Sequence, residues 1–187
     1  KPFSGNLHIP ELCIKVNAKF CNFITSYSGG KNVTFMDFSG INTFEDFIIP
    51  NSCEHVKLCR CKKMMRISGG KNCKSLNISE SGIIGIIELP PLCKTFIAKK
   101  CKHLTGFKDN KLCSNIDISQ SNFFGCINIP NSCRNFICSY TKINSFSGGK
   151  KIINLTAYNC NLTGDIIIPK NYKNVNLKLN KINYILI

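Results

Sequence analysis

The sequence contains no run of about 18 apolar residues, the length that a membrane-spanning helix needs. It also shows no leader of charged and then apolar residues after Lys1, so no targeting segment is visible. Apolar residues as such are plentiful: 43% of the 187 residues are hydrophobic and 10% are aromatic, too many for a disordered chain. These numbers predict one folded domain with a core of its own.

Acidic residues are scarce. Ten Asp and Glu stand against 25 Lys and Arg, which gives a formal net charge of +15 at pH 7. A field of this sign attracts acidic proteins, nucleic acid or anionic membranes. The 22 Lys, 23 Asn and 27 Ile all have AT-rich codons, however, and genome bias alone would produce the same enrichment. The charge by itself therefore identifies no partner.

Motifs that would mark an active site or a metal site are missing as well. No C-x-x-C pair occurs, and the spacings of Cys59 to Cys61 and of Cys133 to Cys138 do not form the paired sets typical of zinc ligands. The three Ser-Gly-Gly-Lys segments lack the G-x-x-x-x-G-K-[ST] phosphate loop. The three histidines lie far apart and have no matching Ser or Cys with an orienting acid. The sequence therefore predicts no enzyme, no cofactor and no metal site.

The chain does contain an internal repeat. Hydrophobe-proline pairs recur at spacings of 40, 40, 40 and 39 residues: Ile9-Pro10, Ile49-Pro50, Leu89-Pro90, Ile129-Pro130 and Ile168-Pro169. Each 40-residue unit is itself a pair of units of about 20 residues. After a partial repeat at 1–12, the repeats start at Cys13, Val33, Cys53, Cys73, Cys93, Cys113, Cys133, Ile152 and Tyr172. We therefore expect a single repeat domain over residues 1–187.

The apolar positions of the repeat are counted from each start as offset zero. Offset three is apolar in every repeat, as in Val16, Val56, Phe96 and Phe136, and offset five is apolar in the same way, as in Phe38. Offset eight is mostly Cys, Ser, Thr or Asn. Since side chains alternate along a strand, offsets three and five predict a short strand with one face inward. We expect offsets zero, three and five to form three buried columns.

This pattern, apolar-x-x-apolar-x-apolar-x-x-(Cys/Ser/Asn)-x-(x)-apolar, resembles the leucine-rich repeat over nearly the whole chain. The last repeat matches the family pattern best, with Val175, Leu177, Asn180 and Ile182. The recurring I-x-I-P-x-x-C-x-x-F segment is similar to the proline-containing short repeats of bacterial effectors and to BspA-like repeats of protists. Cys and Ile stand where the family usually has Leu. The resemblance implies a right-handed leucine-rich-repeat superhelix with a parallel concave sheet that binds a partner.

The convex side of this superhelix is expected to be mostly non-helical. Only about a dozen residues return from one strand to the next repeat start, which leaves little room for a helix of two or three turns with its loops. Ile-x-Ile-Pro and Ser-Gly-Gly-Lys are extended or turn sequences. The predicted fold class is a β-rich solenoid whose convex side consists of extended segments and turns, with room for short 3₁₀ pieces.

Packing explains most of the 13 cysteines. Six of them open a repeat, four occupy offset eight, and Cys138 takes a core place at offset five. At offset eight the family usually has Asn, which bonds the backbone of a neighbouring turn, and Cys, Ser or Thr can act as weaker donors. The odd count prevents a complete set of disulfides within one chain. We expect buried, reduced thiols and hence a cytoplasmic location, with an extracellular or surface location as the alternative.

The resemblance places a partner surface on the concave face, at offsets two, four and seven, with offsets one and six on its flanks. The candidates are Lys15, Lys19, Phe35, His55, Lys57, Arg60, Lys94, Ile97, Lys99, Lys100, Arg134, Ile137, Tyr140 and Tyr158. Exposed aromatic residues beside cations are typical of protein-binding hot spots. In the simpler alternative, charges on this face only screen one another across neighbouring strands. The acidic residues do not cluster as a catalytic pair, and Glu54, Glu80, Asp37 and Asp117 are expected to be solvated face residues.

We expect a protein partner, and the positive charge of the face would suit an acidic one. Two alternatives stay open: an electrostatic binder of nucleic acid or an anionic membrane surface, and the recognition region of a larger multidomain protein. A binder of single-stranded nucleic acid would need aromatic residues in register with the basic repeats. Phe35 lies in an acidic repeat and Tyr158 in a neutral one, so nucleic acid is the less favoured partner.

Neither end of the sequence has the polar cap that a solenoid needs. Residues 5–10 match residues 85–90 and 125–130 in frame, and the last repeat keeps apolar inward residues. We therefore expect further repeats or end-to-end self-association, in which Val16, Ala18, Leu177 and Ile182 would be covered.

Overall fold

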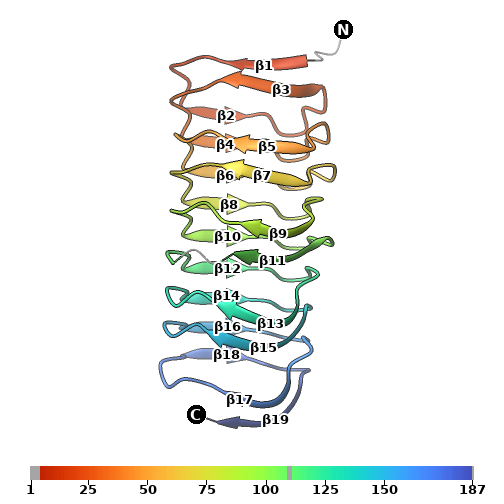
Figure 1. Ribbon diagram of the computed structural model, residues 1–187, viewed down its shortest axis with the longest axis vertical. Helices are drawn as coiled ribbons and strands as arrows, with labels where there is room; N and C mark the ends of the chain where they lie inside the picture. Colours follow the sequence, from red (N-terminus) through yellow and green to blue (C-terminus); the bar gives the residue numbers. More distant parts are fainter. Residues whose placement is uncertain (1–4, 109–110, 187) are drawn as a thin grey trace.

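The computed structural model describes residues 5–108 and 111–186 as a stack of short β-strands. Within these ranges the chain forms 19 strands and neither an α-helix nor a 3₁₀-helix. The rungs of the stack follow one another along a single axis, with the two termini at opposite ends (Figure 1). Over the same ranges there is consequently no helix long and apolar enough to cross a membrane.

One face of the stack is a parallel sheet of nine strands, which corresponds to the predicted concave sheet. In spatial order these strands are β2 (Lys15–Asn17), β4 (Phe35–Asp37), β6 (His55–Lys57), β8 (Ser75–Asn77), β10 (Thr95–Ile97), β12 (Asn115–Asp117), β14 (Asn135–Ile137), β16 (Asn154–Thr156) and β18 (Asn174–Asn176). The register advances by 20 residues per rung, and by 19 where Phe136 pairs with Leu155. Residues at the same offset therefore lie side by side in columns.

The opposite face consists of ten strands that pair two by two. These are β1 (Gly5–Ile9) with β3 (Ile24–Gly29), β5 (Asp46–Ile49) with β7 (Arg66–Gly69), β9 (Gly85–Glu88) with β11 (Leu104–Lys108), β13 (Phe124–Ile129) with β15 (Lys142–Gly148), and β17 (Thr163–Ile167) with β19 (Lys181–Leu186). The expected extended convex side is confirmed. The 40-residue period is visible as these pairs, since each pair joins one hydrophobe-proline repeat to the repeat that follows it.

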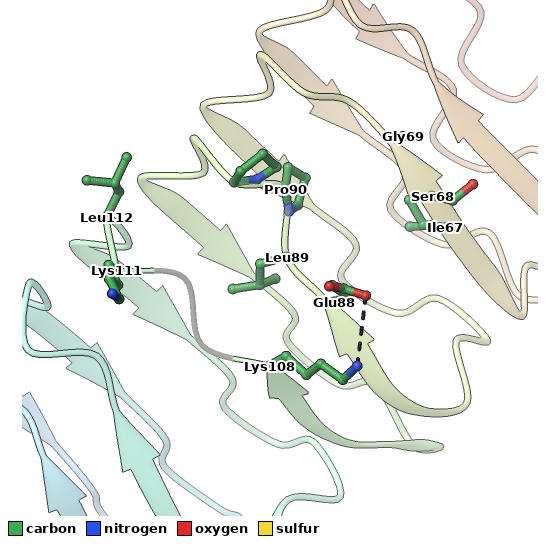
Figure 2. Close-up of a pocket in the computed structure, with 10 residues that line it drawn as sticks. Ile67, Ser68, Gly69, Glu88, Leu89, Pro90, Lys108, Lys111 and Leu112 are labelled. Atoms are coloured by element: carbon green, nitrogen blue, oxygen red, sulfur yellow. Dashed lines mark ion pairs between the residues drawn. The ribbon is translucent and has the colours of Figure 1, made fainter.

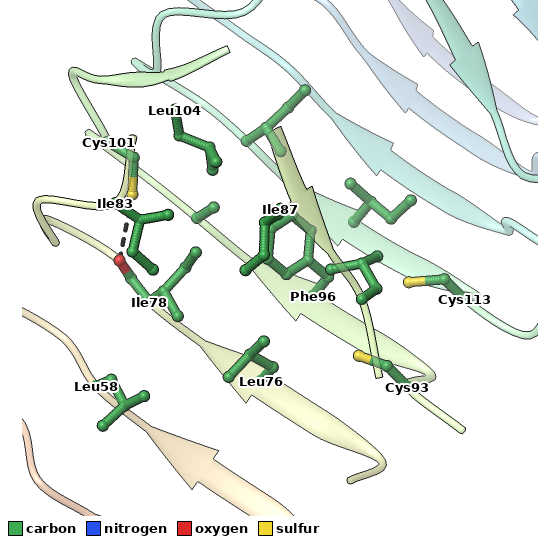
Figure 3. Close-up of a cluster of buried hydrophobic side chains, with 14 of the residues drawn as sticks. Leu58, Leu76, Ile78, Ile83, Ile87, Cys93, Phe96, Cys101, Leu104 and Cys113 are labelled. Carbon is green, nitrogen blue, oxygen red and sulfur yellow. Dashed lines mark hydrogen bonds between the residues drawn. The ribbon is translucent and has the colours of Figure 1, made fainter. Parts of the chain in front are cut away.

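The core lies between the two faces and contains the three predicted columns. Val16, Val56, Phe96 and Phe136, all at offset three, are buried, as are all nine residues at offset five. Figure 3 shows Phe96 packed beside Ile87 of β9, with Cys93 and Cys113 of the offset-zero column nearby. The columns loosen at the two ends of the sheet, where Cys13 and Tyr172 are half-buried and Val175 is 41% exposed. The core prediction is thus confirmed for the rungs between them.

Offset eight forms a ladder of donors to the backbone, as the cysteine pattern predicts. The Cys61 Sγ donates to the Phe38 carbonyl at 3.3 Å, and Cys101 donates in the same way to Ile78 at 3.2 Å (Figure 3). In the last rung Asn180 Nδ2 donates to the Ala157 carbonyl at 2.6 Å. Each bond joins one rung to a buried carbonyl of the preceding rung and so ties neighbouring rungs together.

A left-handed corner follows every strand of the nine-stranded sheet. All nine offset-seven residues have positive φ; besides Gly40 they are Phe20, Arg60, Glu80, Lys100, Gln120, Tyr140, Asn159 and Leu179. Side-chain oxygens at offset four support several of these corners, as where Asp117 Oδ1 accepts hydrogen bonds from both the N–H and the hydroxyl of Ser119. Because the corner recurs in every repeat, it belongs to the chain path rather than to any one site.

Glycine is required at the Ser-Gly-Gly turns for space as well as for conformation. A Cβ on Gly69 would lie 2.5 Å from the Ile49 carbonyl oxygen, whereas a Cβ on Gly85 would meet nothing within 4 Å; φ is +79° and +75° respectively. We expect Gly85→Ala to cost about 1–2 kcal/mol, the penalty for a left-handed L-residue. Gly69→Ala should cost clearly more in urea unfolding, and equal losses would contradict the clash.

Candidate functional site

The outer face of the nine-stranded sheet presents offsets two and four of each repeat. These residues flank the inward offset three, so their side chains point away from the core. Offsets six and seven follow at the left-handed corner, and offset one precedes the strand. All 14 candidate residues occupy one of these five offsets, and each of them is exposed or half-buried.

At the β2 end of the sheet, two lysines meet one aromatic ring. Lys15 Nζ lies 4.9 Å from the centroid of the Phe35 ring, and Lys57 Nζ lies 5.8 Å from it. The three residues come from β2, β4 and β6, which are consecutive strands. His55 pairs in register with Phe35 and is exposed. The structure thus joins four of the candidates into one patch: cation–π contacts hold three of them, and strand pairing places His55 beside them.

The interpretation of Asp37 as a solvated face residue is wrong. Its side chain is only 2% exposed. Its Oδ1 accepts a hydrogen bond from the Ser39 N–H at 3.1 Å, and its Oδ2 forms an ion pair with Lys19 Nζ at 3.3 Å. A carboxylate can be buried in this way because a cation and a backbone donor replace its water. Asp117, with Lys99 at 2.8 Å, is in the same position of the repeat and is 13% exposed.

Ion pairs between neighbouring rungs occupy three of the candidate cations. Besides the pairs of Lys19 and Lys99, Arg60 Nε lies 3.5 Å from a carboxylate oxygen of Glu80. For these residues the structure favours the simpler explanation, in which unlike charges screen one another across the sheet. Six candidates form no ion pair with any acidic residue in the described ranges: Lys15, His55, Lys57, Lys94, Lys100 and Arg134.

Towards the β18 end, offsets two and four of β14, β16 and β18 carry only uncharged residues, and two tyrosines follow the strands. The rings of Tyr140 and Tyr158 meet edge to face, with centroids 5.3 Å apart, and the Tyr140 N–H donates to the Tyr158 carbonyl. Ile137 lies at the end of β14, three residues before Tyr140, and Ile97 lies two rungs away on β10. The tyrosines form a second patch on the sheet, separate from the one around Phe35.

Lys94, Lys100 and Arg134 join neither patch. Lys94 and Arg134 directly precede β10 and β14, at the entrance to the sheet, whereas Lys100 occupies a left-handed corner at its exit. The candidate surface therefore divides into two clusters, three cations held in ion pairs and three separate cations.

An asparagine ladder on this face was not predicted. At offset two, Asn135 Nδ2 donates to Asn115 Oδ1 at 2.5 Å, Asn154 donates to Asn135 at 2.5 Å, and Asn174 donates to Asn154 at 2.6 Å. The signal was present in the sequence, because four consecutive repeats have Asn at the same offset. The ladder holds amide groups at strand spacing across β12, β14, β16 and β18.

One hollow of about 620 Å³ opens at the β2 end of this sheet, where Val16, Asn17 and Ala18 line it. A larger one lies away from the sheet. A groove of about 690 Å³ lies beside β7, β9 and β11, where the Glu88–Lys108 ion pair of 3.9 Å borders it (Figure 2). Its described lining residues include one carboxylate, two lysines and no histidine or cysteine. Nowhere in residues 5–108 and 111–186 do three or more potential metal ligands gather. Neither observation points to a catalytic or metal centre.

Comparison with known proteins supports the fold. No protein-family model and no curated protein matches the sequence. A solved structure with a similar fold is YopM from Yersinia enterocolitica WA-314, with a TM-score of 0.55 and 14% sequence identity. The similarity covers 97% of this chain and 50% of the YopM chain, so this chain spans half the length of that one. The fold is therefore that of a leucine-rich-repeat-like solenoid with a parallel sheet, as the sequence predicts.

Proposed function

We propose that the protein is a binding scaffold that recognises a protein partner through the outer face of its nine-stranded sheet. Leucine-rich-repeat-like solenoids are typically non-catalytic interaction scaffolds, which supports the coarser half of this proposal. The choice of face rests on the candidate residues, and the uncompensated cations on it suit an acidic partner.

One observation carries the proposal: side chains on this face are held in place before any partner arrives. The two lysines lie over Phe35, the tyrosines contact each other, and the asparagine amides bond from rung to rung. Ordering flexible side chains is a large part of the cost of association, so a surface that is already ordered binds at a lower cost. Exposed aromatic residues within such a surface are typical binding hot spots.

The face is tested with a photo-crosslinking amino acid at Ile137 on the nine-stranded sheet and, as a control, at Ile86 on β9. We expect a protein adduct at position 137 that is absent at position 86. The crosslinked partner is then identified, and the affinity of this partner, in free form, for the purified chain is measured by calorimetry. Tyr140→Ala with Tyr158→Ala should weaken this affinity by about tenfold or more.

The matched control removes exposed apolar area from the other side of the solenoid. Ile86 is 65% exposed on β9 and Phe124 is 61% exposed on β13, so Ile86→Ala with Phe124→Ala should leave the affinity unchanged. Equal losses in the two double variants would overturn the choice of face. Co-purified nucleic acid that is released at high salt, without a protein adduct, would favour the electrostatic alternative.

A further inference from the structure

The patch at the β2 end of the sheet brings two positive charges to one ring. Lys15 and Lys57 come from the strands on either side of β4, and their ammonium groups lie 4.9 Å and 5.8 Å from the centroid of Phe35. Both lysines are exposed and Phe35 is half-buried, so the patch is open to solvent. Two ammonium groups near one ring repel each other, while each is attracted to the face of the ring.

No acidic side chain of the described residues neutralises these two lysines. Asp37 lies on β4, the strand of Phe35, but its carboxylate is buried and already binds Lys19 and the Ser39 N–H. Lys57 pairs in register with Asp37, yet it forms no ion pair with it. The patch therefore keeps a positive charge that the described residues do not balance.

The other cations of the face differ from this pair. Arg60 and Lys99 are each bound to a carboxylate of the next rung. Lys94, Lys100 and Arg134 form neither an ion pair nor a cation–π contact within the described residues. Among the described residues, Phe35 is the one aromatic ring on which two cations without an acidic partner converge.

We propose that Lys15 and Lys57 form a subsite for an anionic side chain of the protein partner. This inference rests on the proposed function and specifies the group that is recognised: the carboxylate of Asp or Glu, or the phosphate of a phosphorylated residue. An anion between the two ammonium groups accepts charge-assisted hydrogen bonds from both and removes their mutual repulsion. Phe35 lies beneath and holds the lysines near each other while it packs against apolar parts of the partner.

The experiment uses the whole chain with three short peptides that are identical except for one central residue: glutamate, phosphoserine or glutamine. Binding is followed by NMR through the side-chain signals of Lys15, Lys57 and Phe35. We expect the glutamate and phosphoserine peptides to shift these three sets of signals, and the glutamine peptide to leave them in place. The glutamate and phosphoserine peptides show which source of negative charge the subsite prefers. Inorganic phosphate alone serves as a further anionic probe.

Two variants with the same change in charge separate the subsite from the general field of the protein. Lys15→Gln with Lys57→Gln should lower the affinity for the anionic peptides by about tenfold or more. Lys62→Gln with Lys63→Gln removes two exposed lysines outside the sheet that form no ion pair with a described residue, and it should change the affinity less than twofold. Equal losses in both variants would reduce the effect to net charge and overturn the subsite.

A third variant, Phe35→Leu, keeps an apolar residue and removes the ring. It should weaken binding of the anionic peptides several-fold while the thermal unfolding midpoint stays near that of the unmodified protein. One outcome is that the double variant Lys15→Gln with Lys57→Gln binds the identified partner normally while Tyr140→Ala with Tyr158→Ala does not. That result would support the scaffold function and contradict the subsite. If neither variant affects the partner, the choice of face itself is wrong.

Discussion

Replacing Phe96 by alanine is expected to lower the free energy of unfolding by about 3–5 kcal/mol. Phe96 is fully buried on β10, in register between Leu76 and Ile116. The centroid of its ring lies 5.8 Å from that of Phe107. In a solenoid each rung packs only on its neighbours, so a cavity in a middle rung weakens the contacts that join the two halves. Urea unfolding followed by circular dichroism measures the loss.

The matched control is Phe124→Ala, because Phe124 is 61% exposed on β13. Truncation of an exposed ring should change the stability by no more than about 0.5 kcal/mol. Comparable losses for Phe96 and Phe124 would mean that the offset-three column is not the core of the molecule.

Raising the pH above about 9 is expected to destabilise the protein through its buried thiols. Burial raises the pKa of Cys53 to about 11 and the pKa of Cys73 and Cys133 to about 12, from an ordinary value of 9.0. A thiol whose pKa is higher in the folded state stabilises the fold below the unfolded pKa, and that contribution is lost as the pH rises through the folded pKa. A rise from 9 to 11 corresponds to about 3 kcal/mol for one thiol at a pH above both values. The stability should therefore be constant up to about pH 8 and fall between about pH 9 and pH 12.

Lysines and tyrosines also titrate in this range, so the thiol contribution needs its own control. Val33 and Ile152 occupy the same column as Cys73 and Cys133, which shows that the position accepts an apolar residue without a thiol. Cys73→Val with Cys133→Val should therefore keep the stability at pH 7 within about 1.5 kcal/mol. Above about pH 9, this double variant should lose less stability per pH unit than the unmodified protein.

The measurement is urea unfolding from pH 7 to pH 11.5 for the variant and the unmodified protein. A count of 13 free thiols in denatured protein prepared without reductant establishes that the starting material is reduced. Identical pH profiles for the two proteins would show that the buried thiols do not control alkaline unfolding.

The fold could be predicted because its determinants are local and repeated. Offset three is the middle residue of each three-residue strand and offset five directly follows the strand, so Val56 and Leu58 point inward wherever the strand lies in the stack. The resemblance to leucine-rich repeats implied that offset eight, which Cys61 and Cys101 occupy, donates to the backbone, and both cysteines do so. The pairing of the convex strands two by two was not predicted, because it depends on where left-handed glycines such as Gly69 and Gly85 bend the chain.

The sequence by itself determined which residues share a column, but the tertiary structure decided what the outward side chains in those columns do. Lysine side chains are long, and their position depends on which carboxylate or ring the neighbouring rung offers. Lys19 therefore covers the buried Asp37, whereas Lys15 and Lys57 turn towards Phe35. The asparagine amides and the two tyrosines likewise meet only once the rungs are stacked in register. Inward positions follow from the periodicity of a single strand, but an outward site consists of contacts between strands, and those exist only in the assembled stack.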